Sequence, residues 1–186
     1  MGMPQAVHRF TVDEYHRMGE AGILDEDARV ELVHGQVVQM SPIGARHAAC
    51  VKRLLALLAP LAGHRATVSI QDPIILGTHE EPQPDVALLR YRTDAYEAAL
   101  PQAADTLLVI EVADTSLARD RDEKLPLYAG AGIPEAWLVD LPEDLVEIRR
   151  TPERGGYIDV RVARRSETIA PLAFPDVALA VAAILG

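Results

Sequence analysis

The stretch Leu107 to Asp140, LLVIEVADTSLARDRDEKLPLYAGAGIPEAWLVD, contains two apolar segments separated by a polar one. The first, Leu107–Val112, is almost continuously apolar, which is typical of a central strand covered on both faces. Residues 116–132 have a helical pattern and lead into a second strand at Ala136–Asp140. Strand, helix and strand in this order form a crossover unit, whose two strands run parallel. The sequence therefore predicts an α/β fold, with a mixed β-sheet flanked by helices.

Other short runs rich in Val, Ile, Leu and aromatic residues predict further strands on both sides of this unit. They are Ala66–Gln71, Pro73–Leu76, Val86–Tyr91 and Val146–Arg150, followed by a last hairpin at Tyr157–Ala163 and an apolar tail from Phe174. Within this tail, Val177–Leu185 either completes the core or forms half of a dimer contact. Pro126 implies a kink, or a helix start, within the crossover helix.

The N-terminal third predicts a short helix, a hairpin and a longer helix. Thr11-Val-Asp-Glu14 is a capping-box pattern, so we expect a helix that ends near Gly19. Within Glu31–Met40, a His-Gly pair separates two β-prone runs, which indicates a hairpin. An apolar stripe at helical spacing predicts a helix from His47 to about Ala62, ended by Gly63.

The composition is that of a globular protein, with 49% hydrophobic and 25% charged residues. No apolar run is long enough to cross a bilayer, and the first residues lack the apolar region of a secretory signal. Cys50 is the single cysteine and can form no internal disulfide. We expect a cytoplasmic protein without a membrane partner, folded as one domain over residues 1–186.

The charge does not indicate a nucleic-acid partner. The chain has 28 acidic residues and 18 Lys or Arg, a formal net charge of −10, whereas proteins that grip phosphate backbones usually have basic surfaces. A weak arginine cluster between Arg149 and Arg165 is interpreted as the solvated faces of late strands. A nucleic-acid function would therefore have to follow from a site.

Two carboxylates in predicted strands are the first candidates for such a site. Asp85 follows Pro84 at the start of one strand, and Glu111 lies among apolar residues in the central strand. A buried carboxylate must be paired, protonated or bound to a metal. If the two strands are neighbours in register, the carboxylates converge on one proton or cation, and oxygen ligands suit Mg²⁺ or Mn²⁺. The alternative is an arginine partner for Glu111, or a position at the exposed end of its strand.

The polar segment Asp120-Arg-Asp-Glu-Lys124 follows the central strand. Lys124 lies one helical turn from Asp120 and is able to reach back over the end of the sheet, but an ordinary ion pair on a solvated helix face explains this spacing equally well. His47, near a helix start, is either a metal or phosphate ligand or a capping or core histidine. Trp137 and Tyr128 are expected to pack in apolar elements.

In their order along the chain, these motifs resemble those of the Uma-type restriction endonucleases, a family of the PD-(D/E)xK nuclease superfamily. The resemblance extends from about Phe10 to the C-terminus. It rests on Glu31-Leu-Val-His-Gly35, His47, Pro84-Asp85-Val86, Ile110-Glu111-Val112, Asp120 with Lys124, Tyr128, and Gly132-Ile-Pro-Glu-Ala-Trp137-Leu-Val-Asp140. Each motif is short, but their ordered combination is specific.

The resemblance implies a restriction-endonuclease-like fold with an N-terminal helix and hairpin, and catalytic roles for Asp85, Glu111 and Lys124. Asp85 and Glu111 would bind Mg²⁺ or Mn²⁺ together with the Val112 carbonyl. The superfamily's lysine usually follows the second acid by two residues, where this chain has Ala113; in this family it has moved to the next helix, which matches Lys124. Accessory positions near the same site match Glu31, His47 and Asp120.

The implied function is a metal-dependent endonuclease that hydrolyses phosphodiester bonds of nucleic acid, with DNA as the first expectation and a homo-oligomer compatible with it. In this mechanism Lys124 orients the attacking water. The alternative is a non-catalytic interaction module that retains the nuclease fold. The net charge of −10 and Ala113 favour the module, whereas the set of Asp85, Glu111 and Lys124 favours the enzyme.

Overall fold

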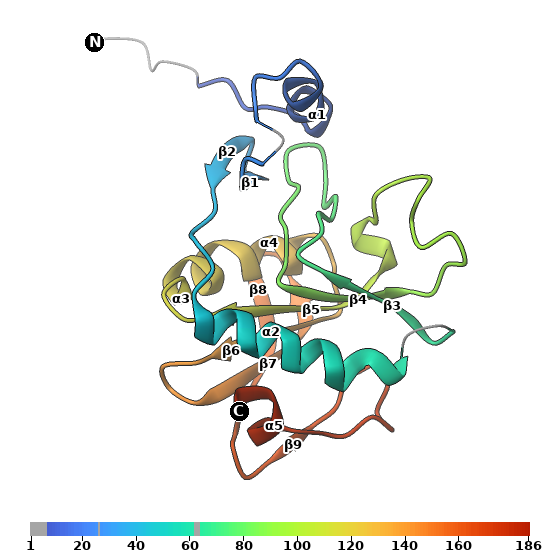
Figure 1. Ribbon diagram of the computed structural model, residues 1–186, viewed down its shortest axis with the longest axis vertical. Coiled ribbons are helices and arrows are strands. Elements are labelled where there is room, and N and C mark those ends of the chain that lie inside the picture. Colours follow the sequence, from blue (N-terminus) through green and yellow to red (C-terminus); the bar gives the residue numbers. More distant parts are fainter. Residues whose placement is uncertain (1–6, 26, 62–63) are drawn as a thin grey trace.

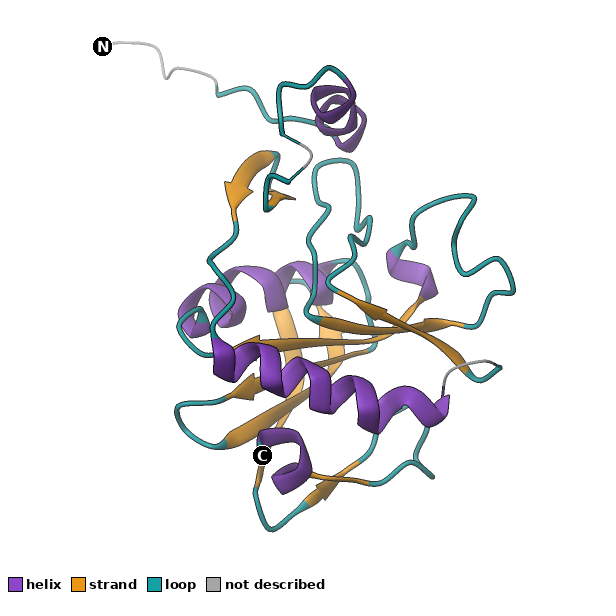
Figure 2. Cartoon of the chain, viewed as in Figure 1, coloured by secondary structure: helices purple, strands orange, loops and turns teal. Residues whose placement is uncertain are grey.

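The computed structural model, which describes residues 7–25, 27–61 and 64–186, is built around a six-stranded mixed sheet (Figure 1, Figure 2). The strand order is β3-β4-β5-β6-β7-β8. The strands are β3 Ala66–Ile70, β4 Val86–Arg90, β5 Thr106–Ala113, β6 Glu135–Asp140, β7 Leu145–Glu153 and β8 Gly156–Arg164. Neighbours are antiparallel except β5 and β6, which are parallel as the crossover predicted. The predicted α/β class is confirmed.

The crossover between β5 and β6 is helical but irregular. It consists of α3 Leu117–Arg119, a π-helical turn η3 over Asp120–Lys124, and α4 Leu125–Gly130. In the π-helical turn, the N–H of Leu125 bonds to the carbonyl of Asp120, five residues earlier. Pro126, at the start of α4, lacks an N–H group and crowds the preceding turn. The sequence predicted a kink or a helix start near this proline, and the structure has a π-helical turn directly before it.

Helices cover both faces of the sheet. On one face lie α2 Ala45–Leu58, extended by the 3₁₀ turn η1 Ala59–Leu61, and α5 Val181–Leu185 (Figure 1). The short strands β9 Thr168–Ile169 and β10 Leu179–Ala180 pair with each other, and their buried residues also join the core on this face. The apolar C-terminal tail therefore completes the core. The opposite face packs against α4.

The N-terminal residues form the predicted helix and hairpin. Helix α1 Val12–Glu20 begins with the complete capping box of Thr11 and Glu14. The hairpin of β1 Val30–Val33 and β2 Gln36–Gln39 turns at His34 and Gly35, whose φ angles of 52° and 70° suit a two-residue turn. Figure 1 shows the chain passing from β2 directly into α2.

Two expectations about strands were wrong. Residues 73–76 form no regular strand, because their backbone bonds are divided between two segments: the Ile74 N–H bonds to the Pro82 carbonyl, and Ile75 makes an isolated bridge with Gln102. Residues 157–163 are one strand and no hairpin, since β8 pairs along its whole length with β7. The actual turn is at Arg154 and Gly155, between Glu153 and Gly156, and Gly155 has a positive φ of 100°.

The remaining expectations concern helix ends and burial. Gly63, the expected end of the second helix, lies outside the described residues. Trp137 and Cys50 are fully buried, and burial raises the pKa of the Cys50 thiol to about 11, so it is unreactive at neutral pH. Among the helices of the described ranges, none has the length and apolar character needed to span a bilayer.

Candidate active site

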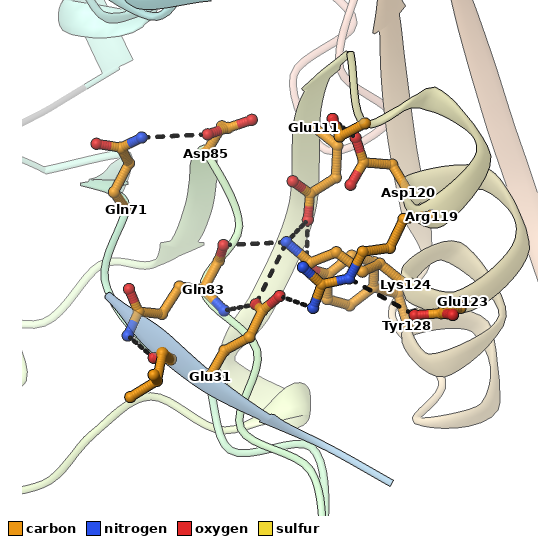
Figure 3. Close-up of polar contacts among 12 residues, drawn as sticks. Glu31, Gln71, Gln83, Asp85, Glu111, Arg119, Asp120, Glu123, Lys124 and Tyr128 are labelled. Atoms are coloured by element: carbon orange, nitrogen blue, oxygen red, sulfur yellow. Dashed lines mark hydrogen bonds and ion pairs between the residues drawn. The ribbon is translucent and has the colours of Figure 1, made fainter. Parts of the chain in front are cut away.

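The register of β4 and β5 places Asp85 opposite Glu111. Val86 pairs with Ile110 in this antiparallel ladder, so the residue before β4 lies beside the residue that follows Ile110. The Asp85 side chain confirms this arrangement, because its Oδ2 accepts the N–H of Val112 at 2.8 Å. Both carboxylates therefore lie at the same level of the sheet, on adjacent strands (Figure 3).

Asp85 is held in its ionised form by neighbouring donors. Its Oδ1 lies 2.9 Å from Nε2 of His47 and accepts a hydrogen bond of 3.2 Å from Gln71. Burial raises the pKa of this carboxyl, but His47, the Val112 N–H and Lys124 outweigh burial, and the net pKa is lowered. The same contact with Asp85 raises the pKa of His47, against the effect of burial.

Glu111 is 2% exposed and has two partners on the crossover helix. Its Oε1 accepts a hydrogen bond of 2.5 Å from the Tyr128 hydroxyl and lies 2.8 Å from Nζ of Lys124. Burial raises the pKa of Glu111 to about 8, although the Lys124 ammonium acts in the opposite direction. The carboxylates of Asp120 and Asp85 contribute to the increase, as like charges do.

Lys124 lies at the centre of a group of oxygen atoms. Besides Glu111, its Nζ contacts the Gln83 carbonyl at 3.1 Å and Oε2 of Glu31 at 3.5 Å (Figure 3). Burial lowers the pKa of this amine, but the nearby carboxylates of Glu111, Glu31 and Asp120 outweigh burial and raise it. Lys124 therefore stays protonated although it is only 4% exposed.

Glu31 connects the N-terminal hairpin to this group. Its Oε1 lies 2.6 Å from Nη2 of Arg119, and its Oε2 accepts the N–H of Gln83 at 3.0 Å. The side chain is fully buried although it comes from a two-stranded hairpin outside the main sheet. Arg119 thus joins β1 to the crossover helix.

Asp120 and Lys124 share the buried side of the π-helical turn. Asp120 accepts a hydrogen bond of 2.5 Å from the Ser116 hydroxyl. Burial raises the pKa of Asp120, and Lys124 and Ser116 partly offset this effect. Residues four apart share one face of a helix, so both side chains point inward, next to the strand that carries Glu111.

One cleft of about 180 Å³ collects all six residues singled out in the sequence. They are Glu31, His47, Asp85, Glu111, Asp120 and Lys124. The sequence interpretation missed two polar partners, the Arg119 guanidinium and the Tyr128 hydroxyl. Tyr128 packs in the core as expected, but its hydroxyl also donates to Glu111. Its position four residues after Lys124 places it on the same side of the helix, and this spacing could have indicated the contact.

The donor set in the cleft fits a magnesium-type cation. No group of three or more His, Cys, Asp or Glu side chains arranged to hold a metal occurs in the described ranges. Mg²⁺ usually takes one or two carboxylates and completes its shell with water and substrate phosphates. Asp85 and Glu111 supply two such carboxylates side by side. Of the two carboxylate oxygens of Glu111, Oε1 contacts Lys124 and Tyr128 on the crossover helix.

A mixed sheet with carboxylates on two neighbouring strands, and a helix that brings a lysine to them, defines the restriction-endonuclease-like class of protein. The Uma2 family, described as "Putative restriction endonuclease", matches residues 12–182. The chain belongs to this family. No curated protein matches.

A solved structure shows the same fold over almost the whole chain. It is described as a "putative nuclease belonging to DUF820" from Anabaena variabilis. The two chains are 16% identical, the TM-score is 0.71, and the match covers 95% of this chain and 97% of the other. At this level of identity the similarity establishes the architecture of the sheet and helices.

Proposed function

We propose that the protein is a metal-dependent endonuclease that hydrolyses phosphodiester bonds, with Asp85, Glu111 and Lys124 as its catalytic residues. The observation that carries the proposal is the contact of 2.8 Å between Lys124 and Glu111, in the cleft that Asp85 also lines. The chain has only one other lysine, Lys52. An amine buried among carboxylates is a costly arrangement, and such arrangements occur at functional sites.

The carboxylates of Asp85 and Glu111 would hold Mg²⁺ or Mn²⁺, with the Val112 carbonyl as a further ligand. The cation, when bound, polarises a phosphate oxygen and lowers the pKa of a bound water. Lys124 would orient the attacking water and stabilise the extra negative charge on the phosphate in the transition state. Its contact with the Gln83 carbonyl would hold the amine in the cleft independently of Glu111.

Accessory roles follow from the contacts of the neighbouring residues. His47 donates to Asp85 and holds the orientation of its carboxylate. Glu31 accepts from Arg119 and lies beside Lys124, so it fixes the amine from the hairpin side. Asp120 raises the pKa of Lys124 and keeps it charged.

DNA is the proposed substrate, and the net charge of −10 predicts weak, salt-sensitive binding. Arg29 and Arg119 line the cleft and supply local positive charge. The net charge also favours the second candidate, an interaction module that has the fold without the chemistry. The two candidates differ in whether the cleft binds a divalent cation and cleaves.

The test is cleavage of plasmid DNA with Mg²⁺ or Mn²⁺ at low salt, by wild type and by two matched lysine variants. Lys124→Met should reduce the rate by about 10²-fold or more, the usual effect of removing a group that stabilises transition-state charge. Lys52→Met removes an exposed lysine from α2 and should cleave as wild type does. Equal loss in both variants, or equal activity in both, would overturn the role of Lys124.

Cation binding is measured separately, by thermal unfolding with and without Mn²⁺. A ligand that binds only the folded state raises the unfolding temperature. Wild type and Asp114→Asn, whose carboxylate lines the same cleft, should respond, whereas Asp85→Asn should not. A wild type that neither responds to Mn²⁺ nor cleaves DNA would support the interaction module.

A further inference from the structure

The outer edge of β8 has the properties of a strand that pairs with another chain. β8 is the last strand of the main sheet, and β7 is its neighbour in that sheet. The Arg164 N–H donates to the Glu167 side chain and its carbonyl accepts from the Glu167 N–H, so these groups point away from β7. Since antiparallel pairs alternate, the N–H and C=O groups of Val160 and Val162 point the same way. The alternation is interrupted at Ile158, where the opposite residue Thr151 has a φ angle of 58° and the two residues do not pair.

An apolar stripe accompanies this edge. Ile158, Val160 and Val162 are 63%, 46% and 45% exposed, and they occupy alternate positions on one face of β8. A long edge strand with exposed β-branched residues is a template for strand addition, and monomeric proteins usually protect such an edge with charge, proline or a covering segment. On this face the three β8 residues themselves are uncharged, and the nearest charges are Arg164 at the end of β8 and Glu147 and Arg149 on β7.

The sequence of β8 is complementary to itself when two copies run antiparallel. β8 comprises the nine residues Gly156–Arg164, and its midpoint is Val160. A two-fold axis at Val160 therefore pairs the central residues Ile158–Val162 with themselves, while the outward N–H and C=O of Arg164 stay bonded to Glu167. In this register Ile158 lies opposite Val162 of the second copy, and the apolar stripe becomes continuous across the axis.

The same register brings opposite charges together on the other face of the strand. Asp159 lies opposite Arg161 of the second copy, and by symmetry Arg161 lies opposite its Asp159. Both residues are exposed, and within the described part of the chain Asp159 forms no ion pair, whereas Arg161 contacts Glu167 at 2.9 Å. Pairs directly opposite each other in antiparallel strands interact most strongly when their charges are opposite.

We propose that the chain forms a two-fold symmetric dimer through its β8 edge, in which the two six-stranded sheets join into one continuous sheet. The partner is a second copy of this chain, because both the apolar and the charged positions are satisfied by the same strand in antiparallel orientation. Such an interface is isologous and closes at two subunits. The candidate active site is on β4 and β5, separated from β8 by β6 and β7, so neither cleft is covered.

Sedimentation of the full-length chain over a range of concentrations tests the dimer. Wild type should reach twice the 20.2 kDa mass of one chain. Asp159→Arg and Arg161→Asp each place like charges opposite each other at both symmetric positions, so each should raise the dissociation constant by about tenfold or more. The double variant Asp159→Arg/Arg161→Asp restores opposite charges and should dimerise as wild type does.

Two further variants make the result specific. Val160→Lys puts two ammonium groups at the two-fold axis and should give a folded monomer, since the position is exposed. Arg17→Asp changes an exposed charge on α1 and should leave the dimer intact. A wild type that stays monomeric, a dimer that tolerates Val160→Lys, or a double variant that fails to recover would each overturn the proposal. Lys124→Met must dimerise normally, so the outcome is independent of catalysis.

Discussion

The Nζ atom of Lys124 lies 2.8 Å from Oε1 of Glu111, and both side chains are almost completely buried. The pair joins the central strand to the helix that follows it. Burial disfavours each charge, so the attraction between the two and the hydrogen bonds around them must compensate for the loss of water. Removing either partner leaves the other in an unfavourable environment.

This pair should show strong energetic coupling in a double-mutant cycle. Above pH about 8, where Glu111 is ionised, Lys124→Met alone leaves a buried carboxylate and should lower the free energy of unfolding by about 3–5 kcal/mol. Glu111→Gln/Lys124→Met should be more stable than the sum of the single effects predicts, with a coupling energy of about 1–3 kcal/mol. Urea unfolding of the metal-free proteins measures this coupling energy. Purely additive effects of the two substitutions would mean that the two residues do not interact.

The Tyr128 hydroxyl should matter for the site as well as for stability. Tyr128→Phe keeps the buried ring but removes the donor to Glu111, so the free energy of unfolding should fall by about 1 kcal/mol and Mn²⁺ affinity should change. Tyr157→Phe is the matched control, because its hydroxyl donates to the Ile133 carbonyl, away from the cleft. Both variants should lose similar stability, measured by urea unfolding. If calorimetry shows the same Mn²⁺ affinity for both, Tyr128 has only a packing role.

The pH dependence of stability should reveal the state of Glu111. Its pKa is raised to about 8 in the folded protein, against 4.5 in an ordinary environment. Between these values the folded state keeps a proton that the unfolded chain has released. The free energy of unfolding should therefore fall as the pH rises from about 5 to about 8.

Glu111→Gln isolates this contribution, because glutamine does not titrate. The stability of metal-free wild type minus that of Glu111→Gln should decrease with rising pH in this window, measured by urea unfolding at closely spaced pH values. A difference that increases with pH would show a lowered pKa and an ionised Glu111. Asp85 has the opposite sign: its lowered pKa stabilises the fold above pH about 4, and this contribution is lost in acid.

The hairpin of β1 and β2 should depend on Glu31 for its attachment. Arg119 lies 2.6 Å from Glu31, which is buried, and 3.6 Å from Glu123, which is exposed. Glu31→Gln removes one charge of a buried pair and should increase amide hydrogen exchange in β1 and β2. Glu123→Gln removes an exposed pair and should leave exchange within error of wild type. If both variants exchange alike, the hairpin is attached by other contacts.

Much of the fold followed from local signals in the sequence. These signals each involve residues close together in the chain, so the sequence alone is enough to recognise them. They are the capping box at Thr11, the two-residue turn at His34 and Gly35, and the apolar stripe of α2. The failure at residues 73–76 has the opposite cause. These residues are apolar because they pack in the core, where Ile74 is fully buried, but their backbone bonds only at single points, to residues 80–82 and 101–103.

The residues that line the candidate cleft were predictable, and their contacts were not. The position of Glu111 in an apolar strand and the Pro84-Asp85 pair singled out the two carboxylates but left open whether their strands are neighbours, as β4 and β5 are in the structure. Whether Lys124 faces the sheet or the solvent depends on the hydrogen-bond pattern of one turn, which residue spacing does not determine. The role of Arg119 depends on where the hairpin folds back, which is a tertiary property.

The π-helical turn at Asp120–Lys124 makes the length of this segment as important as its composition. Removing one residue from the π-helical turn would restore regular α-helical bonding, and the residues up to Asp120 and from Leu125 onward would keep their orientation, because the extra residue is confined to that one turn. The lysine would then follow Asp120 by three residues instead of four and would leave the helix from a different point on its surface. An alignment gap in this segment of a homologue therefore bears on its chemistry as directly as the identity of its polar residues.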